Sequence, residues 1–308
     1  MIGRWFSTLV RSRRFSSATH EAVHHPPDRR LRVWTRPRYL ALAGVVVLAG
    51  VALAWAHWLI FGLPPEAPLR AVAETPPSPY GFPPWVRLTH FVNLLLLTLL
   101  VRSGLSILMD HPRLYWSSHC TPNTEWMRFT PLKVPTDRPW QAKDDARYIS
   151  PVLGLPGYRH TIGMARSWHF LTVHGFVLNG LIFVALLFLT DQWKRLVPTS
   201  WEILPHAWST FVHYATFHMP REPNGFYAFN PLQQLGYFGV VFVVAPLSML
   251  TGLAMSPALD NRYPWFPKLF GGRQAARSIH FLLLASYVGF DSSSCTWDWS
   301  RSPGSRAT

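Results

Sequence analysis

Apolar stretches alternate with polar segments along the 308-residue chain, and most of them are long enough to cross a membrane as a helix. A helix rises about 1.5 Å per residue, so about 20 apolar residues span a hydrocarbon core of about 30 Å. This pattern predicts an all-α integral membrane protein. The predicted spans are 40–63, 85–109, 164–190, 232–255 and a last one that begins near Ala275.

The last predicted span is shorter than the others. From Ala275 to Phe290 there are 16 residues, about 24 Å of helix, which is less than a full crossing. Asp291 and three serines follow, and we expect them to end the helix, which is then truncated. A helix that ends inside lipid leaves backbone groups unsatisfied. Either protein contacts cover the polar tail 291–308, or a change such as a frameshift has altered this C-terminus; we favour the second interpretation.

The polar segments differ in charge. Lysine and arginine number 19 in segments 1–39, 110–163 and 256–273, but 4 in segments 64–84 and 191–231. Basic segments tend to stay in the cytoplasm, so the tail 1–39 is expected on that side, disordered and without a cleaved signal peptide. The expected location is the bacterial inner membrane, which the chain crosses several times.

Composition supports a membrane protein and excludes several other classes. The chain is 49% hydrophobic, 15% aromatic and 14% charged. Its net charge of +14 does not indicate nucleic-acid binding, because the charge lies in tails and loops between apolar spans. Cys120 and Cys295 are the two cysteines, too few for a four-cysteine cluster and without the spacing for covalent haem. A disulfide between Cys120 and Cys295 is an alternative to two free thiols, and we favour it less.

Three of the predicted spans open with the pattern Arg-x-x-His. A three-residue step places both side chains on one helix face, one turn apart, with the arginine at the membrane surface. Histidine inside a membrane is costly and by default indicates function. The pattern predicts haem b in a helix bundle, with imidazole binding the iron and guanidinium pairing with a propionate. Simple anchoring of the helix ends is the alternative role of the arginines. The three pairs are Arg87 with His90, Arg166 with His169, and Arg277 with His280.

His169 and His280 begin helices that run in the same direction, so we expect them at one depth as the axial ligands of one haem. His90 lies near the opposite surface and cannot share that iron. Its partner is expected about fourteen residues after His280, roughly 21 Å along the helix and close to the same face. That position is Ser294. The sequence thus predicts one complete haem site and one half site.

Small residues recur toward the far ends of the predicted helices, in Ser103-Gly104, Asn179-Gly180 and Thr251-Gly252. Glycine allows a flat macrocycle or another helix to approach the backbone. Gly104 lies fourteen residues after His90, close to the same helix face, and we assign it to cofactor binding. Plain helix packing explains each pair equally well when it is taken alone.

The other histidines are weaker candidates. His174 lies five residues after His169, about 140° around the helix, and therefore points elsewhere. Residues 201–219 are apolar and aromatic but interrupted by Pro205, and they predict an interfacial helix rather than a span. This helix carries His206, His213 and His218, whose spacing and lack of an acidic partner favour packing over a metal site.

Residues 85–290 resemble the bacterial cytochrome b561 and nickel-hydrogenase type di-haem membrane subunits. The likeness is strongest to the cytochrome b subunits of molybdopterin oxidoreductases, of the thiosulfate-reductase or formate-dehydrogenase gamma kind. Besides the three Arg-x-x-His pairs and the small-residue pairs, it rests on residues Pro112 to Trp116, Pro246 to Ala258, Gly271-Gly272-Arg273 and Phe281.

The resemblance implies a four-helix haem-binding bundle that transfers electrons between the quinone pool and a water-soluble partner oxidoreductase, so that this chain is not the catalytic subunit. In that family the last helix carries two histidines about fourteen residues apart, one for each haem. The chain departs from the pattern by an extra N-terminal transmembrane helix, 40–63, and by the missing second histidine.

Two other functions fit parts of the sequence. A haem-free or haem-poor membrane anchor that docks a soluble oxidoreductase would explain the truncated last helix, and it would be colourless. A transporter is disfavoured, because charges within the predicted spans are few and no paired broken helices appear.

Overall fold

The computed structural model describes residues 33–68, 70–71, 82–121, 123–129, 137–139, 146, 149, 152–155, 162–218 and 228–299, with residues 70–71, 228 and 291–299 described by their backbone alone. Most of the basic tail 1–39, most of the Pro-rich loop 64–84 and most of the loop 130–161 lie outside these ranges. The helices are α2 (Pro37–Phe61), α3 (Pro84–Leu108), α5 (Ile162–Leu189), α6 (Trp193–Leu196), α7 (Ile203–Ala215), α8 (Pro231–Phe238), the π-helical turn η1 (Gly239–Val244), α9 (Ala245–Ala254), α10 (Pro257–Arg262), α11 (Trp265–Lys268) and α12 (Arg273–Trp299).

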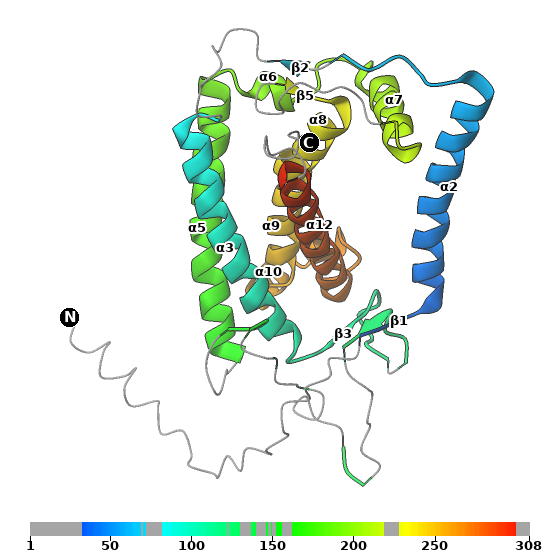
Figure 1. Ribbon diagram of the computed structural model, residues 1–308. Helices are drawn as coiled ribbons and strands as arrows, with labels where there is room; N and C mark the ends of the chain where they lie inside the picture. The colour runs from blue at the N-terminus through cyan, green and yellow to red at the C-terminus, as the bar shows by residue number, and fades with distance from the viewer. Residues whose placement is uncertain are drawn as a thin grey trace.

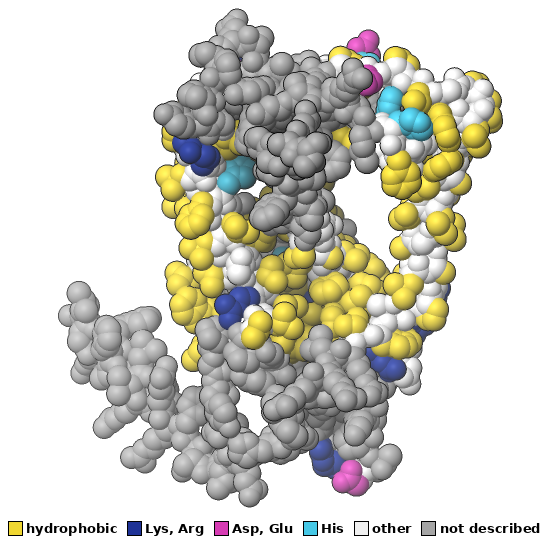
Figure 2. Space-filling view, viewed as in Figure 1, with side chains coloured by type: hydrophobic (Ala, Val, Ile, Leu, Met, Phe, Trp, Pro, Cys, Tyr) yellow, Lys and Arg dark blue, Asp and Glu magenta, His cyan; other side chains and the backbone are white. Residues whose placement is uncertain are grey.

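Four helical segments are long and apolar enough to cross a membrane: α2, α3, α5 and the continuous segment Pro231–Ala254 that joins α8, η1 and α9. Their bounds lie within a few residues of the first four predicted spans. Hydrophobic side chains cover α2 and the outer surface of α3 and α5 (Figure 2), as expected for helices that face lipid. The prediction of an all-α integral membrane fold is therefore confirmed.

The bundle consists of two helix pairs. α3 packs along α5, and α9 packs along α12 (Figure 1). A glycine allows the close approach of the first pair, because a Cβ atom at Gly175 of α5 would lie 3.2 Å from the Leu96 side chain of α3. Each pair carries one of the two histidines that were predicted to share an iron, His169 on α5 and His280 on α12.

The extra N-terminal helix α2 stands beside this bundle and is attached mainly at its ends (Figure 1). Ala54 is its one fully buried residue. Near its C-terminal end, Trp55 Nε1 donates to the Ala215 carbonyl of α7 at 3.0 Å, and the Trp58 ring packs against His218 at 5.0 Å. α7 has 13 residues and is too short to cross a membrane, as predicted.

Short strands that the helical pattern did not predict fasten the loops. β1 (Trp34–Thr35), β4 (Met127–Arg128) and β3 (Arg113–Leu114) form an antiparallel sheet in that order. A second pair joins β2 (Arg70–Ala71) to β5 (Ala228–Phe229). Two-residue pairings satisfy backbone groups locally and leave no periodic signal in the sequence.

Residues 110–121 and 123–129 form a strap across the end of the bundle where His169 and His280 lie. Trp126 is buried, and its Nε1 donates to Ser278 Oγ of α12 at 2.9 Å, while Ser278 Oγ donates to the Tyr115 carbonyl at 2.7 Å. The Trp126 ring also packs against Phe281, the residue that follows His280. The strap therefore holds the first turns of α12 in place.

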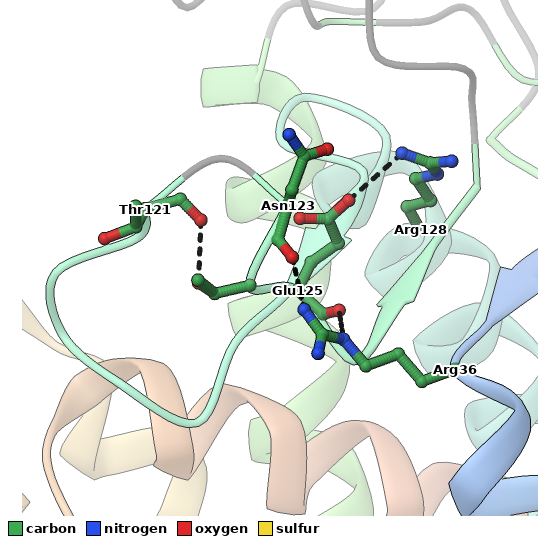
Figure 3. A network of polar contacts seen from close by, with 6 residues as sticks. Arg36, Thr121, Asn123, Glu125 and Arg128 are labelled. Atoms are coloured by element: carbon green, nitrogen blue, oxygen red, sulfur yellow. Dashed lines mark hydrogen bonds and ion pairs between the residues drawn. The ribbon is translucent and has the colours of Figure 1, made fainter.

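A polar network ties the strap to the entry of α2 (Figure 3). Arg36 donates from Nε to the Glu125 carbonyl at 2.9 Å and from its other end to the Asn123 carbonyl. The Glu125 side chain is 1% exposed and pairs with Arg128 at 3.2 Å, and the Arg128 guanidinium lies over the Trp34 ring. One carboxylate oxygen of Glu125 has no hydrogen-bond donor among the described residues. Stabilisation of the buried negative charge of Glu125 therefore depends on its ion pair with Arg128.

We expect Arg128→Ala to destabilise the protein by about 3 kcal/mol, because it leaves the Glu125 carboxylate buried without its cation. The midpoint of thermal unfolding in detergent measures the effect. Lys194→Ala is the matched control, since Lys194 pairs with Asp191 at the same 3.2 Å and the same spacing but at an exposed site, where such pairs contribute less than about 1 kcal/mol. Adding Glu125→Gln to Arg128→Ala should recover stability; equal effects of Arg128→Ala and Lys194→Ala would contradict this interpretation.

Cys120 of the strap is a free thiol, and burial raises its pKa, outweighing the lowering by Arg277. It is therefore mostly protonated at neutral pH and a poor metal ligand. The side chain of Cys295 lies outside the described residues.

The π-helical turn η1 lies in the middle of the fourth spanning segment and just before Pro246. Proline has no backbone N–H and crowds the carbonyl four residues earlier, so a wider turn at this point avoids the conflict. The π-helical turn also rotates α9 relative to α8 and so changes which face of α9 contacts α12. A Cβ atom at Gly236 would lie 3.3 Å from Phe290, and one at Gly252 would lie 3.5 Å from His280, so both glycines face α12.

The predicted end of the last helix is wrong, because α12 continues to Trp299. Aspartate, serine, threonine and cysteine are weaker helix formers than alanine but do not break a helix, and residues 291–299 contain neither glycine nor proline. The polar composition of its second half keeps α12 outside the four segments that are apolar enough to span.

Candidate functional site

His169 and His280 face each other between the two helix pairs. Their ring centres lie 6.5 Å apart, and the ring planes cross at 67°. His169 projects from α5 and His280 from α12, each within the first turns of its helix. The structure therefore brings together the two histidines that were expected to share an iron.

Helix α3 supports the His169 ring. Ser103 Oγ lies 2.9 Å from His169 Nδ1, and Ser103 is fully buried. The next residue, Gly104, lies beneath the ring, where a Cβ atom would be 3.6 Å from His169 Cε1. The Nδ1–Cε1 edge of His169 thus faces α3.

Helix α9 supports the His280 ring in the same way. Thr251 Oγ1 lies 3.1 Å from His280 Nδ1 and Thr251 is fully buried, while the Ser248 carbonyl lies 3.0 Å from the same nitrogen. A Cβ atom at Gly252 would be 3.5 Å from His280 Cε1. Both histidines are therefore held by a hydroxyl residue followed by glycine on the neighbouring helix.

These contacts assign the protons of the imidazoles. A carbonyl oxygen can only accept, so His280 Nδ1 carries a hydrogen that it donates to Ser248. The shortest contact of Ser103 Oγ is with the Leu99 carbonyl at 2.7 Å, so we assign the hydroxyl hydrogen to Leu99 and the Nδ1 hydrogen of His169 to its contact with Ser103. Neutral histidine with a proton on Nδ1 has a lone pair on Nε2. Neither Nε2 has a hydrogen-bond partner among the described residues, and both are available as metal ligands.

The spacing of the rings fits an iron between them. A metal–imidazole bond of about 2 Å on each side, plus roughly 1.1 Å from each nitrogen to its ring centre, separates the centres by about 6 Å. The observed 6.5 Å is close to that value. Gly104 and Gly252 are not required by protein packing, since a Cβ atom there would meet its neighbours at ordinary contact distance. Their missing side chains leave room beside the imidazoles for a flat ring.

The three predicted arginines have different surroundings. Arg277 is half-buried and donates to the His111 carbonyl at 2.6 Å, just beyond the C-terminal end of α3. Arg166 and Arg87 are exposed at the starts of α5 and α3. A fourth cation, Arg102, precedes Ser103 and donates from Nε to the Gly154 carbonyl at 2.8 Å. The sequence reasoning missed Arg102, because it lies within a span rather than in an Arg-x-x-His pair.

His90 lies away from His169 and His280. It is near the N-terminal end of α3, whereas Ser103 and Gly104, which contact His169, are near the C-terminal end. Its Nδ1 lies 2.9 Å from the Val86 carbonyl, and its ring packs edge-on against Phe183 of α5. Asn179 donates to the Thr89 carbonyl at 2.9 Å, a helix-packing contact. No second histidine among the described residues contacts His90, and the side chain of Ser294 lies outside them.

The remaining histidines take part in local contacts. His174 Nδ1 lies 2.6 Å from the Phe170 carbonyl of its own helix. His213 Nε2 lies 2.9 Å from the Pro64 carbonyl, and His218 Nδ1 lies 3.1 Å from Thr216 Oγ1. Within the described part of the chain, no three His, Cys, Asp or Glu side chains gather as a metal site.

Sequence reasoning found the facing histidines and the glycines but did not find how the rings are held. The signal was present, because Ser103-Gly104 and Thr251-Gly252 are the same hydroxyl–glycine pair on two helices. Which histidine each pair contacts became visible only from the packing of α3 on α5 and of α9 on α12.

Comparison with known proteins identifies the family of the chain. Over 216 residues the chain is 24% identical to a protein of Azospira oryzae named putative protein-methionine-sulfoxide reductase subunit YedZ1. The match covers 68% of this chain and 84% of YedZ1. No solved structure matched the chain. The family model of the prokaryotic cytochrome b561 proteins matches residues 81–290, which include both helix pairs and all three Arg-x-x-His motifs. The chain therefore belongs to the prokaryotic cytochrome b561 family.

Proposed function

We propose that the chain is a haem-b subunit that passes electrons between the quinone pool and a partner oxidoreductase, and that His169 and His280 are the axial ligands of one haem. The observation that carries the proposal is the pair of facing imidazoles, 6.5 Å apart and each supported at Nδ1. A bound haem would supply one-electron redox chemistry. The chain would hold it between two helix pairs that exclude water.

The arginines at this end of the bundle are proposed to hold the propionates. Arg166 is exposed one turn from His169 and can turn toward a carboxylate, whereas Arg277 already binds a backbone carbonyl. We therefore assign the larger part of this role to Arg166. Arg87 would serve the same purpose only if the half site at His90 were filled.

One haem rather than two is proposed, because His90 has no histidine partner among the described residues and the position fourteen residues after His280 is a serine. The similarity to a reductase subunit supports a partner oxidoreductase, which we propose to be of the molybdopterin type.

The charge asymmetry of the loops supports a cytoplasmic N-terminus in a bacterial inner membrane. With that orientation, the ends of the bundle that carry His169 and His280 lie on the cytoplasmic side.

The function is tested with the full chain in lipid nanodiscs under anaerobic conditions. We expect a water-soluble quinol, duroquinol, to reduce the bound haem, seen as the α-band of a reduced b cytochrome, and ferricyanide to reoxidise it. A haem that dithionite reduces but duroquinol does not would contradict the quinone role. A colourless protein would contradict the cytochrome role and leave the membrane-anchor interpretation.

A further inference from the structure

We propose that Ser103 and Thr251 are positioning residues whose hydroxyls hold the two facing imidazoles crossed, with Nδ1 protonated, and thereby lower the reduction potential of the haem. The inference rests on the proposed function, since it concerns the haem that His169 and His280 would bind. It assigns a specific role to two residues that touch neither the iron nor a substrate.

The two hydroxyl residues are equivalent although they lie 148 positions apart in the sequence. Both are fully buried, both precede a glycine that lies beneath a histidine ring, and both lie within about 3 Å of Nδ1 of that histidine. They project from α3 and α9, the helices that accompany α5 and α12. The same arrangement thus occurs on both sides of the space between the rings.

Each hydroxyl acts toward its histidine as an acceptor. Ser103 Oγ donates to the Leu99 carbonyl at 2.7 Å, and Thr251 Oγ1 donates to the Leu247 carbonyl at 2.8 Å. A hydroxyl has one hydrogen, so the contact with the imidazole is Nδ1–H donating to oxygen. At His280 this N–H is shared between Thr251 Oγ1 at 3.1 Å and the Ser248 carbonyl at 3.0 Å. An acceptor at this position increases electron density on the imidazole, which favours the ferric over the ferrous state and lowers the potential.

The same bonds fix the rotation of each ring. A hydrogen bond at Nδ1 sets the angle of an imidazole about its bond to a metal at Nε2. Ser103 does this for His169, and Thr251 does it for His280 together with the Ser248 carbonyl. The two planes cross at 67°. Crossed axial imidazoles give a low-spin ferric haem a strongly anisotropic EPR signal, whereas parallel imidazoles give a rhombic signal. The structure therefore predicts the anisotropic type.

The test is a midpoint-potential titration and an EPR spectrum of the full-length protein in detergent. We expect Ser103→Ala and Thr251→Val to retain haem, raise the midpoint potential and shift the EPR signal toward the rhombic type. The effect of Thr251→Val should be the smaller one, because the Ser248 carbonyl still accepts from His280 Nδ1. The conservative variants Ser103→Thr and Thr251→Ser should restore both readings. Thr98→Ala is the matched control, because Thr98 on α3 also donates to a carbonyl four residues back but contacts no histidine.

Unchanged potential and EPR signal in both Ser103→Ala and Thr251→Val would overturn this inference while leaving the proposed function intact. Loss of haem in Ser103→Thr as well as Ser103→Ala would also overturn it, because that pattern indicates a packing requirement rather than a hydroxyl. A wild-type protein without haem would contradict the proposed function itself.

Discussion

Replacing His169 or His280 by alanine is expected to remove the haem from the protein and with it the low-spin spectrum of a b cytochrome. Each histidine would supply one of the two ligands, and no other described histidine makes a ring contact with either of them. Loss of residues that merely orient a ligand lowers metal affinity about 10- to 100-fold, so loss of the ligand itself should lower the affinity for haem by more than that. Haem per polypeptide and the reduced spectrum of the purified variants measure the effect.

Two other histidines provide controls, His174 on the same helix as His169 and His90 on α3, which packs along it. His174→Ala removes an imidazole from α5 whose Nδ1 contacts only its own helix, and His90→Ala removes the one at the opposite end of α3. Both proteins should keep a full haem and an unchanged spectrum. Retention of haem in His280→Ala at the wild-type level would rule out this ligand pair, and loss of haem in His90→Ala would indicate that the second site is occupied.

Inserting one alanine between Val244 and Ala245 is expected to abolish haem binding as well. In a regular α-helix, sixteen residues turn the chain through roughly four turns plus 160°, so Gly236 and Gly252 would point to nearly opposite sides. The π-helical turn absorbs one residue and reduces this angle to about 60°. A further residue would rotate Thr251 and Gly252 by about 100° away from His280.

The converse change should be tolerated. Deleting Val241 shortens the segment between the glycines to fifteen steps, which keeps both on the side of α12. A kink at Pro246 would then replace the wider turn, and the variant should retain its haem. Combining the insertion with this deletion should rescue haem binding. Haem content, with circular dichroism as a check on helix content, distinguishes the three proteins. Equal loss of haem in the insertion and deletion variants would show that the turn itself is needed rather than the register.

The four apolar spans and the facing histidines could be predicted because each depends on local periodicity. Apolar runs of sufficient length fix α2, α3, α5 and the fourth segment, and the Arg-x-x-His step fixes which end of a helix carries the imidazole. Counting the spans gives the direction of each helix across the membrane. His169 and His280 lie near the starts of helices that run in the same direction, so they are expected at the same depth. These inferences need no knowledge of which helices touch.

Features that depend on contacts between distant segments could not be predicted. The strap is fixed by Trp126 bonding to Ser278, 152 residues away, and the support of His280 depends on Thr251 after a π-helical turn. The end of α12 was misjudged for a different reason. Polarity at Asp291 indicates where a helix leaves lipid, but it does not stop the backbone from remaining helical.

The central claim is that one b-type haem lies between His169 and His280, and haem per polypeptide tests it most directly. The pyridine haemochrome assay on detergent-purified, full-length protein gives that number. We expect one haem per chain, lost in His169→Ala and in His280→Ala. No haem in the wild-type protein, or two haems, would contradict the claim.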